Sequence, residues 1–191
     1  MADASFVIET ERLRLREHDP ADAAAMASLF NDIEVVRGTL SVPFPYTFAH
    51  AREWIAGLRP KWIYEGKPTS FAVVLRDGGV LVGSAGLNVD AAHRRGELGY
   101  MYGRAHWGKG YATESCRALL RYGFETLRLH VVYASHWGWN GASARVLEKS
   151  GMRFEGVLRE HGVRLGEVHD SVVYGMVAEE HEAMRRGAVD G

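Results

Sequence analysis

Residues 107–114 read WGKGYATE, and this segment is the part of the chain best suited to binding an anion. Glycine at 108 and 110 and alanine at 112 allow a ligand to approach the backbone N–H groups closely. A helix is expected to begin near Ala112, and the first turn of a helix offers unpaired N–H groups and the positive end of its dipole. The segment therefore fits a pyrophosphate-binding loop, and it fits equally well a tight turn between a strand and a helix that binds nothing.

The overlapping run GRAHWGKG, residues 103–110, comes close to the phosphate-binding loop of nucleotide hydrolases. That pattern needs a Ser or Thr hydroxyl for Mg²⁺ at the position that Gly110 occupies. The strand before the run also belongs to a predicted antiparallel meander, whereas those hydrolases use parallel βαβ units. Both departures argue against an NTPase.

Other residue types suggest little further chemistry. The nine histidines form no His-Glu-x-x-His pattern and the only cysteine, Cys116, lies on the apolar face of a predicted helix, so no metal site is expected. Lys plus Arg number 23 and Asp plus Glu number 24, and the resulting net charge of −1 gives no basic excess that would attract nucleic acid or a membrane surface. The lone cysteine and the absence of an apolar N-terminal run predict a cytoplasmic protein.

The first third of the chain is predicted to fold as a strand followed by two helices. Leu13 and Leu15 alternate with arginines over residues 11–17, which is the period of a strand with one buried face. Asp19 followed by Pro20 predicts the start of the first helix, and Thr47 is expected to cap the second.

The rest of the chain is predicted to alternate between strands and helices around the glycine loop. In chain order the patterns indicate a three-stranded meander, a helix, a strand, a helix and two strands, over residues 70–76, 80–89, 96–103, 112–127, 130–137, 140–151, 152–161 and 169–177, with a short polar tail from residue 179. This order predicts one mixed α+β domain built on a single sheet over residues 1–191.

The motifs in this order resemble the GNAT superfamily of acyl-CoA N-acyltransferases. The resemblance rests on GELGYMY before WGKGYATE, on NGASARVLEKSGMRFEG and on a closing HDSVVYGM strand, and it covers about residues 9–178. TERLRLRE and the Asn-x-x-Ser block are most similar to the ribosomal-protein alanine N-acetyltransferase branch, which includes relatives of spermidine acetyltransferases. The resemblance implies a mostly antiparallel sheet of about seven strands with about four helices, and transfer of acetyl from acetyl-CoA to a primary amine by direct attack in a ternary complex.

The same resemblance implies where the coenzyme binds. The last strand of the meander splays from the next strand in this fold and opens a slot for the pantetheine arm. Trp107 replaces the polar residue that begins the family's pyrophosphate motif, so binding there depends on backbone amides. The implied coenzyme-binding residues are Tyr100, Met101, Tyr102, Trp107, Gly108, Lys109, Gly110, Tyr111, Ala112, Thr113, Asn140 and Ser143.

Amine attack on a thioester needs a neutral amine and a proton for the leaving thiolate. By the resemblance, Glu97 receives the amine proton through water and Ser143 protonates the thiolate. Glu97 also fits a solvent-exposed strand position, and Asn140 and Ser143 also fit helix caps. Glu160 enters as an alternative base, although Gly162 nearby has no side chain to contribute.

The acceptor is the least predictable part of this hypothesis. In the resembled branch it varies among protein N-termini, polyamines, amino acids and amine antibiotics, and residues 33–65 are expected to select it. Arg37, Phe44, Tyr46 and Trp54 are the predicted pocket residues. A homodimer is expected because relatives commonly dimerise. The alternative function is a non-catalytic acyl-CoA-binding module or sensor, which would keep the loop and need neither Glu97 nor Ser143.

Overall fold

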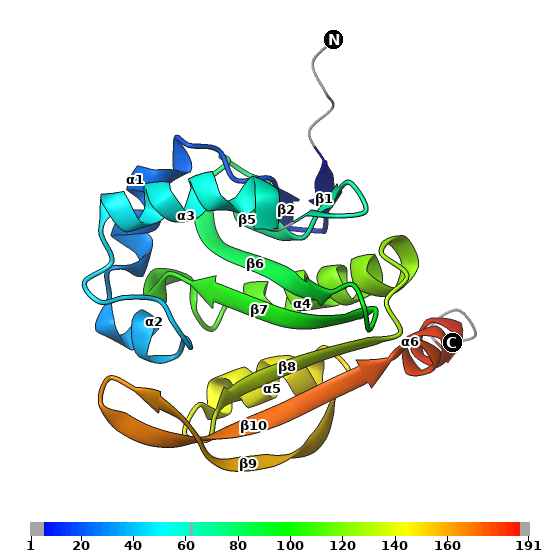
Figure 1. The fold of residues 1–191 in the computed structure, drawn as a ribbon. Helices are drawn as coiled ribbons and strands as arrows, with labels where there is room; N and C mark the ends of the chain where they lie inside the picture. The colour runs from blue at the N-terminus through cyan, green and yellow to red at the C-terminus, as the bar shows by residue number, and fades with distance from the viewer. Residues whose placement is uncertain (1–5, 62, 188–191) are drawn as a thin grey trace.

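One eight-stranded sheet organises the part of the chain that the computed structural model describes, residues 6–61 and 63–187 (Figure 1). Its order is β1-β2-β5-β6-β7-β8-β10-β9, and every neighbouring pair is antiparallel except β7 with β8. The strands are β1 (Val7–Glu9), β2 (Leu13–Arg16), β5 (Ser70–Leu75), β6 (Leu81–Asp90), β7 (Arg95–Tyr102), β8 (Val131–Trp137), β9 (Arg153–Arg164) and β10 (Glu167–Val177). A separate hairpin joins β3 (Ile63–Tyr64) to β4 (Lys67–Pro68).

The mixed, mostly antiparallel α+β fold expected from the sequence is confirmed, with one more strand in the sheet than the seven expected. The additional strand is β1, which pairs with β2 at the edge of the sheet. Six α-helices, against about four expected, lie in the described ranges: α1 (Asp22–Phe30), α2 (Ile33–Arg37), α3 (Phe48–Lys61), α4 (Tyr111–Arg121), α5 (Gly141–Lys149) and α6 (Ala178–Gly187).

Local capping explains two of the differences in the helices. The carboxylate of Asp32 accepts a hydrogen bond from the Glu34 N–H, which starts α2 and separates it from α1. Helix α1 begins at Asp22, later than predicted, because the Asp22 carboxylate turns back to pair with Arg16 and Asp19 lies in the preceding turn. A third difference is α6, which replaces the predicted polar tail.

Helices cover both faces of the sheet, and alternate residues of one strand pack against each set. On β5, Phe71 and Val73 lie in a core with residues of α4 and α5, whereas Ala72 and Val74 lie in a second core with residues of α1 and α3. This alternation is the two-residue period of a strand buried on both faces. The two cores fix α4 and α5 on one face and the N-terminal helices on the other (Figure 1).

The described residues do not meet the requirements of a membrane-spanning helix or of a metal site. Within residues 6–61 and 63–187, every helix falls short of the length and apolar character needed to cross a lipid bilayer. In the same ranges no group of three or more His, Cys, Asp or Glu side chains gathers closely enough to hold a metal ion.

His18 gives the fold a pH dependence that can be measured. It follows β2, with its ring edge-on to Trp54 and its Nε2 atom 3.3 Å from the Ser84 hydroxyl oxygen. Burial lowers the pKa of His18 from 6.5 to about 4. The unfolded chain therefore binds this proton more readily than the folded chain, so the contribution to stability is complete above pH 6.5 and is lost as the pH falls toward 4.

We expect this effect to remove about 3 kcal/mol of unfolding free energy over that pH range, since each pKa unit is worth roughly 1.4 kcal/mol. Urea unfolding between pH 7 and pH 4.5 measures it. The variant His18→Gln should show a shallower dependence on pH, and His93→Gln, at an exposed turn, should keep the original one. If the unfolding free energies of the wild type and His18→Gln changed equally with pH, His18 would not be the source of this pH dependence.

Candidate active site

Strands β7 and β8 are parallel neighbours over a short stretch only. Their pairing joins residues 95–97 to residues 131–133 and stops there, although β7 continues to Tyr102 and β8 to Trp137. Beyond that point the two strands diverge (Figure 1), which confirms the predicted splay. Residues 98–101 therefore have no strand partner on this edge among the described residues. Their free backbone groups can pair with a ligand that carries amides of its own.

A cleft of about 530 Å³ lies at this divergence, between the end of β7, the loop before α4 and the first turn of α5. Helix α2 supplies another wall through Glu34 and Val35, and Trp139 lies at the start of α5. Every residue predicted to bind the coenzyme lines this cleft except Lys109, namely Tyr100, Met101, Tyr102, Trp107, Gly108, Gly110, Tyr111, Ala112, Thr113, Asn140 and Ser143.

The loop between β7 and α4 has the geometry of an anion cradle. Gly108 and Gly110 have φ angles of +72° and +82°, a left-handed conformation that glycine adopts without strain. Helix α4 starts immediately after Gly110, so its first N–H groups face the cleft end of the loop. Arg145 and Lys149 line the same cleft, and their cationic side chains favour a diphosphate there.

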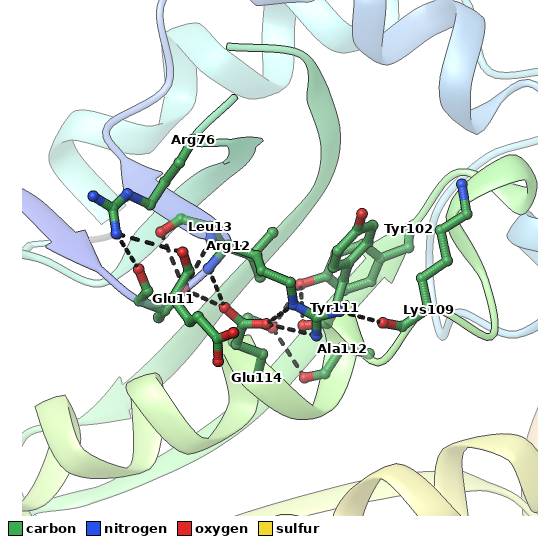
Figure 2. A network of polar contacts seen from close by, with 11 residues as sticks. Glu11, Arg12, Leu13, Arg76, Tyr102, Lys109, Tyr111, Ala112 and Glu114 are labelled. Atoms are coloured by element: carbon green, nitrogen blue, oxygen red, sulfur yellow. Dashed lines mark hydrogen bonds and ion pairs between the residues drawn. The ribbon is translucent and has the colours of Figure 1, made fainter. Parts of the chain in front are cut away.

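Lys109 is the exception because its side chain is exposed and its carbonyl group points toward β2. That carbonyl oxygen accepts a hydrogen bond from Arg12, whose guanidinium also pairs with Glu114 of α4 (Figure 2). The sequence indicates only a strand and a family resemblance for the TERLRLRE run, so this contact between Arg12 and Glu114 was not predicted. The acidic residue in the first turn of α4 was the signal that could have pointed to a cationic partner.

Two tyrosines of β7 lie on the sheet face that α4 and α5 cover. The hydroxyl groups of Tyr102 and Ser115 are hydrogen-bonded, which ties the end of β7 to α4. The Tyr100 hydroxyl is buried beside Ser143 without a well-formed hydrogen bond in the described part of the chain. Burial raises the pKa of Tyr100, so its phenol stays protonated at neutral pH and can donate to a ligand in the cleft.

Asn140 and Ser143 lie at the start of α5, as predicted. The Asn140 side-chain oxygen accepts a hydrogen bond from the Ser143 N–H at 3.1 Å, so Asn140 is the N-cap. The cap uses the backbone of Ser143 and leaves its hydroxyl group free to face the cleft. The capping interpretation and the cleft interpretation are therefore compatible for both residues.

Glu97 lies where the pairing of β7 and β8 ends. It is opposite Tyr133 of β8 and Asn88 of β6, and its half-buried side chain is on the sheet face opposite to that of Leu98. Burial raises the pKa of Glu97 above its usual value. Burial and then the charge of Glu97 raise the pKa of Tyr133. A carboxylate with a raised pKa is a better proton acceptor than an ordinary glutamate.

Neither Glu97 nor the remaining predicted site residues line the cleft. Glu160 is exposed on β9, which is separated from β8 by β10, and its backbone N–H donates to Asp170. Tyr46 is only 5% exposed and packs against Phe30 in the second core, outside the residues that line this cleft.

The other three predicted acceptor residues lie on α2, on α3 and in the loop between these helices. Trp54 of α3 lies edge-on to His18, and Phe44 is 47% exposed in the loop before α3. Arg37 lies nearest the cleft, because its guanidinium carbon is 4.4 Å from the ring centre of Trp139, which lines the cleft.

Comparison with known proteins identifies the family of this chain. Residues 12–153 match the acetyltransferase (GNAT) domain family. The uncharacterized N-acetyltransferase p20 of Bacillus licheniformis is 31% identical over 173 residues, which cover 90% of this chain and 96% of p20. YdaF of Bacillus subtilis, whose name suggests a ribosomal N-acetyltransferase, is 32% identical over 177 residues, covering 90% of this chain and 94% of YdaF.

A solved GNAT-family acetyltransferase of Bacillus anthracis matches the fold with a TM-score of 0.79 and 27% identity, covering 91% of this chain and 99% of that one. The chain therefore belongs to the GNAT family of N-acetyltransferases. Acetyl-CoA is the acetyl donor typical of that family.

Proposed function

We propose that the enzyme transfers acetyl from acetyl-CoA to a primary amine, of a small molecule or a protein N-terminus, by direct attack within a ternary complex. The observation that best supports this proposal is the half-buried Glu97 carboxylate at the point where β7 and β8 separate. The spacing of Asn140 and Ser143, together with the similarity to YdaF, supports the ribosomal-protein branch for this chain.

In this proposal the chain's own residues position the coenzyme and transfer protons. The amides of the loop and of the first turn of α4 hold the diphosphate, and the free edge of β7 pairs with the pantetheine amides. Glu97 accepts a proton from the attacking amine through a water molecule. Ser143 donates a proton to the leaving sulfur, and Asn140 holds the first turn of α5 in place. The coenzyme supplies the activated acetyl group and the thiol leaving group.

The acceptor is proposed to approach Glu97 from the face of the sheet that carries the N-terminal helices. Glu97 lies on that face, and Arg37 of α2 packs on Trp139, which lines the cleft. Phe44, in the loop before α3, and Trp54, on α3, are proposed to contact only a longer acceptor. Glu160 remains the alternative base if Glu97 is dispensable.

The test of this function has two steps. Acetyl-CoA and coenzyme A should each raise the melting temperature in proportion to ln(1 + [L]/Kd), while Mg-ATP should not. Acetyl-CoA should then release free thiol only when an amine acceptor is present, across a panel of polyamines, amino acids and peptide N-termini. Binding with no thiol release for any acceptor would support the non-catalytic module instead. The absence of any response to either coenzyme would contradict both functions.

We also propose a homodimer. Strand β9 is one of the two edge strands of the sheet, and it exposes Phe154, Val157 and Leu158. An apolar edge strand favours pairing with another chain. Sedimentation at micromolar concentration should give twice the mass of the chain, and Val157→Lys should shift the protein toward the single-chain mass. A wild-type protein that sediments as one chain would contradict the proposal.

A further inference from the structure

We propose that the turn between β1 and β2 is a clamp that holds the coenzyme loop in its binding conformation, with Arg12 and Glu114 as positioning residues. The clamp consists of Thr10 and Arg12 from the turn and Glu114 from the first turn of α4 (Figure 2). The inference rests on the proposed coenzyme-binding function and assigns a role to residues outside the catalytic group.

Glu114 is the centre of the clamp. Its Oε1 atom accepts hydrogen bonds from the Thr10 hydroxyl at 2.6 Å and the Arg12 N–H at 2.8 Å, and its Oε2 atom lies 2.7 Å from Arg12 Nε. Burial by itself would raise the pKa of Glu114, but these hydrogen bonds outweigh it and lower the pKa. The carboxylate is therefore charged at neutral pH and engaged on both oxygens.

Arg12 extends the contact from the helix to the loop. Its Nη1 atom donates to the Lys109 carbonyl oxygen at 2.9 Å, and its guanidinium carbon is 5.0 Å from the ring centre of Tyr111. Binding this carbonyl on the β2 side fixes the orientation of the peptide group between Lys109 and Gly110. A Cβ atom at Gly110 would lie 3.2 Å from Arg12 Nη2, so glycine there allows the close approach.

The turn itself is fixed from the other side. Arg76 Nη1 donates to the Thr10 carbonyl oxygen at 2.9 Å, and the Arg76 N–H donates to the Arg12 carbonyl oxygen at 2.9 Å. The Thr10 hydroxyl also bonds the backbone of Leu13. The clamp therefore connects the loop to β2 and β5, in addition to the covalent connections of the loop to β7 and α4.

Charge gives Arg12 a second effect on an anionic ligand. The Glu114 side chain is only 15% exposed and lies one turn from the loop that is proposed to hold a diphosphate. Without Arg12, that carboxylate would be left unpaired near the anion and would repel it. Replacing Glu114 with glutamine should therefore relieve part of the damage caused by removing Arg12.

The experiment is a double-mutant cycle on the full chain with Arg12→Ala, Glu114→Gln and the double variant, read by calorimetric titration of acetyl-CoA. We expect Arg12→Ala to raise the Kd about tenfold or more and to raise the KM for acetyl-CoA in parallel, with kcat within about twofold. The double variant should bind better than the product of the two single losses predicts. Arg14→Ala, two positions farther along the chain on β2 and paired with Glu9, is the matched control and should change nothing.

Three results would overturn the inference. One is an Arg12→Ala enzyme with wild-type affinity. Another is an Arg12→Ala loss of the same size whether position 114 carries glutamate or glutamine, because that result means a direct contact between Arg12 and the ligand. The third is an equal loss in the Arg14→Ala control.

A second variant keeps the inference testable if Arg12→Ala does not fold. Thr10→Val removes one donor to Glu114 at nearly constant shape, and it should weaken acetyl-CoA binding severalfold. Unchanged affinity in the Thr10→Val protein would again overturn the inference. A wild-type protein that binds no coenzyme contradicts the proposed function instead.

Discussion

Replacing Glu97 with glutamine is expected to lower kcat/KM roughly 100-fold at pH 7, the lower end of what a positioned general base contributes. Glutamine has nearly the same shape and cannot accept the amine proton. The KM for acetyl-CoA should change little, because Glu97 lies outside the residues that line the coenzyme cleft. Steady-state kinetics with the best amine of the acceptor panel measure both quantities.

The pH profile gives an independent readout of the same residue. Burial raises the pKa of Glu97, so the wild-type rate should fall on the acidic side at a pH above the ordinary range of a glutamate, as the carboxylate takes up a proton. This acidic limb should be absent from the Glu97→Gln enzyme. Glu167→Gln, at an exposed position near the start of β10, is the control. A loss below about threefold for Glu97→Gln would remove Glu97 from the mechanism and make Glu160→Gln the next variant to measure.

Replacing Ser143 with alanine is expected to lower kcat by roughly 10- to 100-fold, since the leaving sulfur would lose its nearest hydroxyl donor. Stability should be preserved, because Asn140 caps α5 through the backbone N–H of residue 143, which alanine retains. The KM for acetyl-CoA is therefore expected to stay within about threefold. Rapid-quench kinetics together with a thermal melt separate the loss of chemistry from a loss of folding.

The control for Ser143 is Ser41→Ala, at an exposed loop position. An unchanged kcat in the Ser143→Ala enzyme would show that another group, with the buried Tyr100 hydroxyl as the nearest, protonates the sulfur. Tyr100→Phe would then carry the loss that we assign to Ser143.

The parts of the site that depend on neighbours in sequence were predictable. An anion cradle needs small residues followed by a helix N-terminus, and both occur within residues 107–114. The cap of α5 was predictable for the same reason, because Asn140 bonds a group three residues away. Such contacts leave a local pattern that spacing rules can detect.

Contacts between distant segments left no such pattern. Arg12 and Glu114 are separated by 102 positions, and each looks like an ordinary surface charge in its own segment. The splay at Glu97 followed only from the family resemblance, because the end of a strand pairing depends on the path of β8 and not on the residues of β7 alone. The burial of Tyr46 left no local pattern either, since an aromatic residue suits a pocket and a core equally well and its packing depends on α1 and α3.

The short pairing of β7 with β8 also divides the hydrogen bonding of the sheet into two parts. Seven residue positions of β8 run antiparallel to β10, and β6 and β7 pair over their whole shared length, but the two halves of the sheet share only the seam at residues 95–97 and 131–133. A substrate arm lying in the splay would continue that seam as a temporary extra strand. A bound coenzyme would then add backbone hydrogen bonds at the gap between the two parts of the sheet, and its release would remove them.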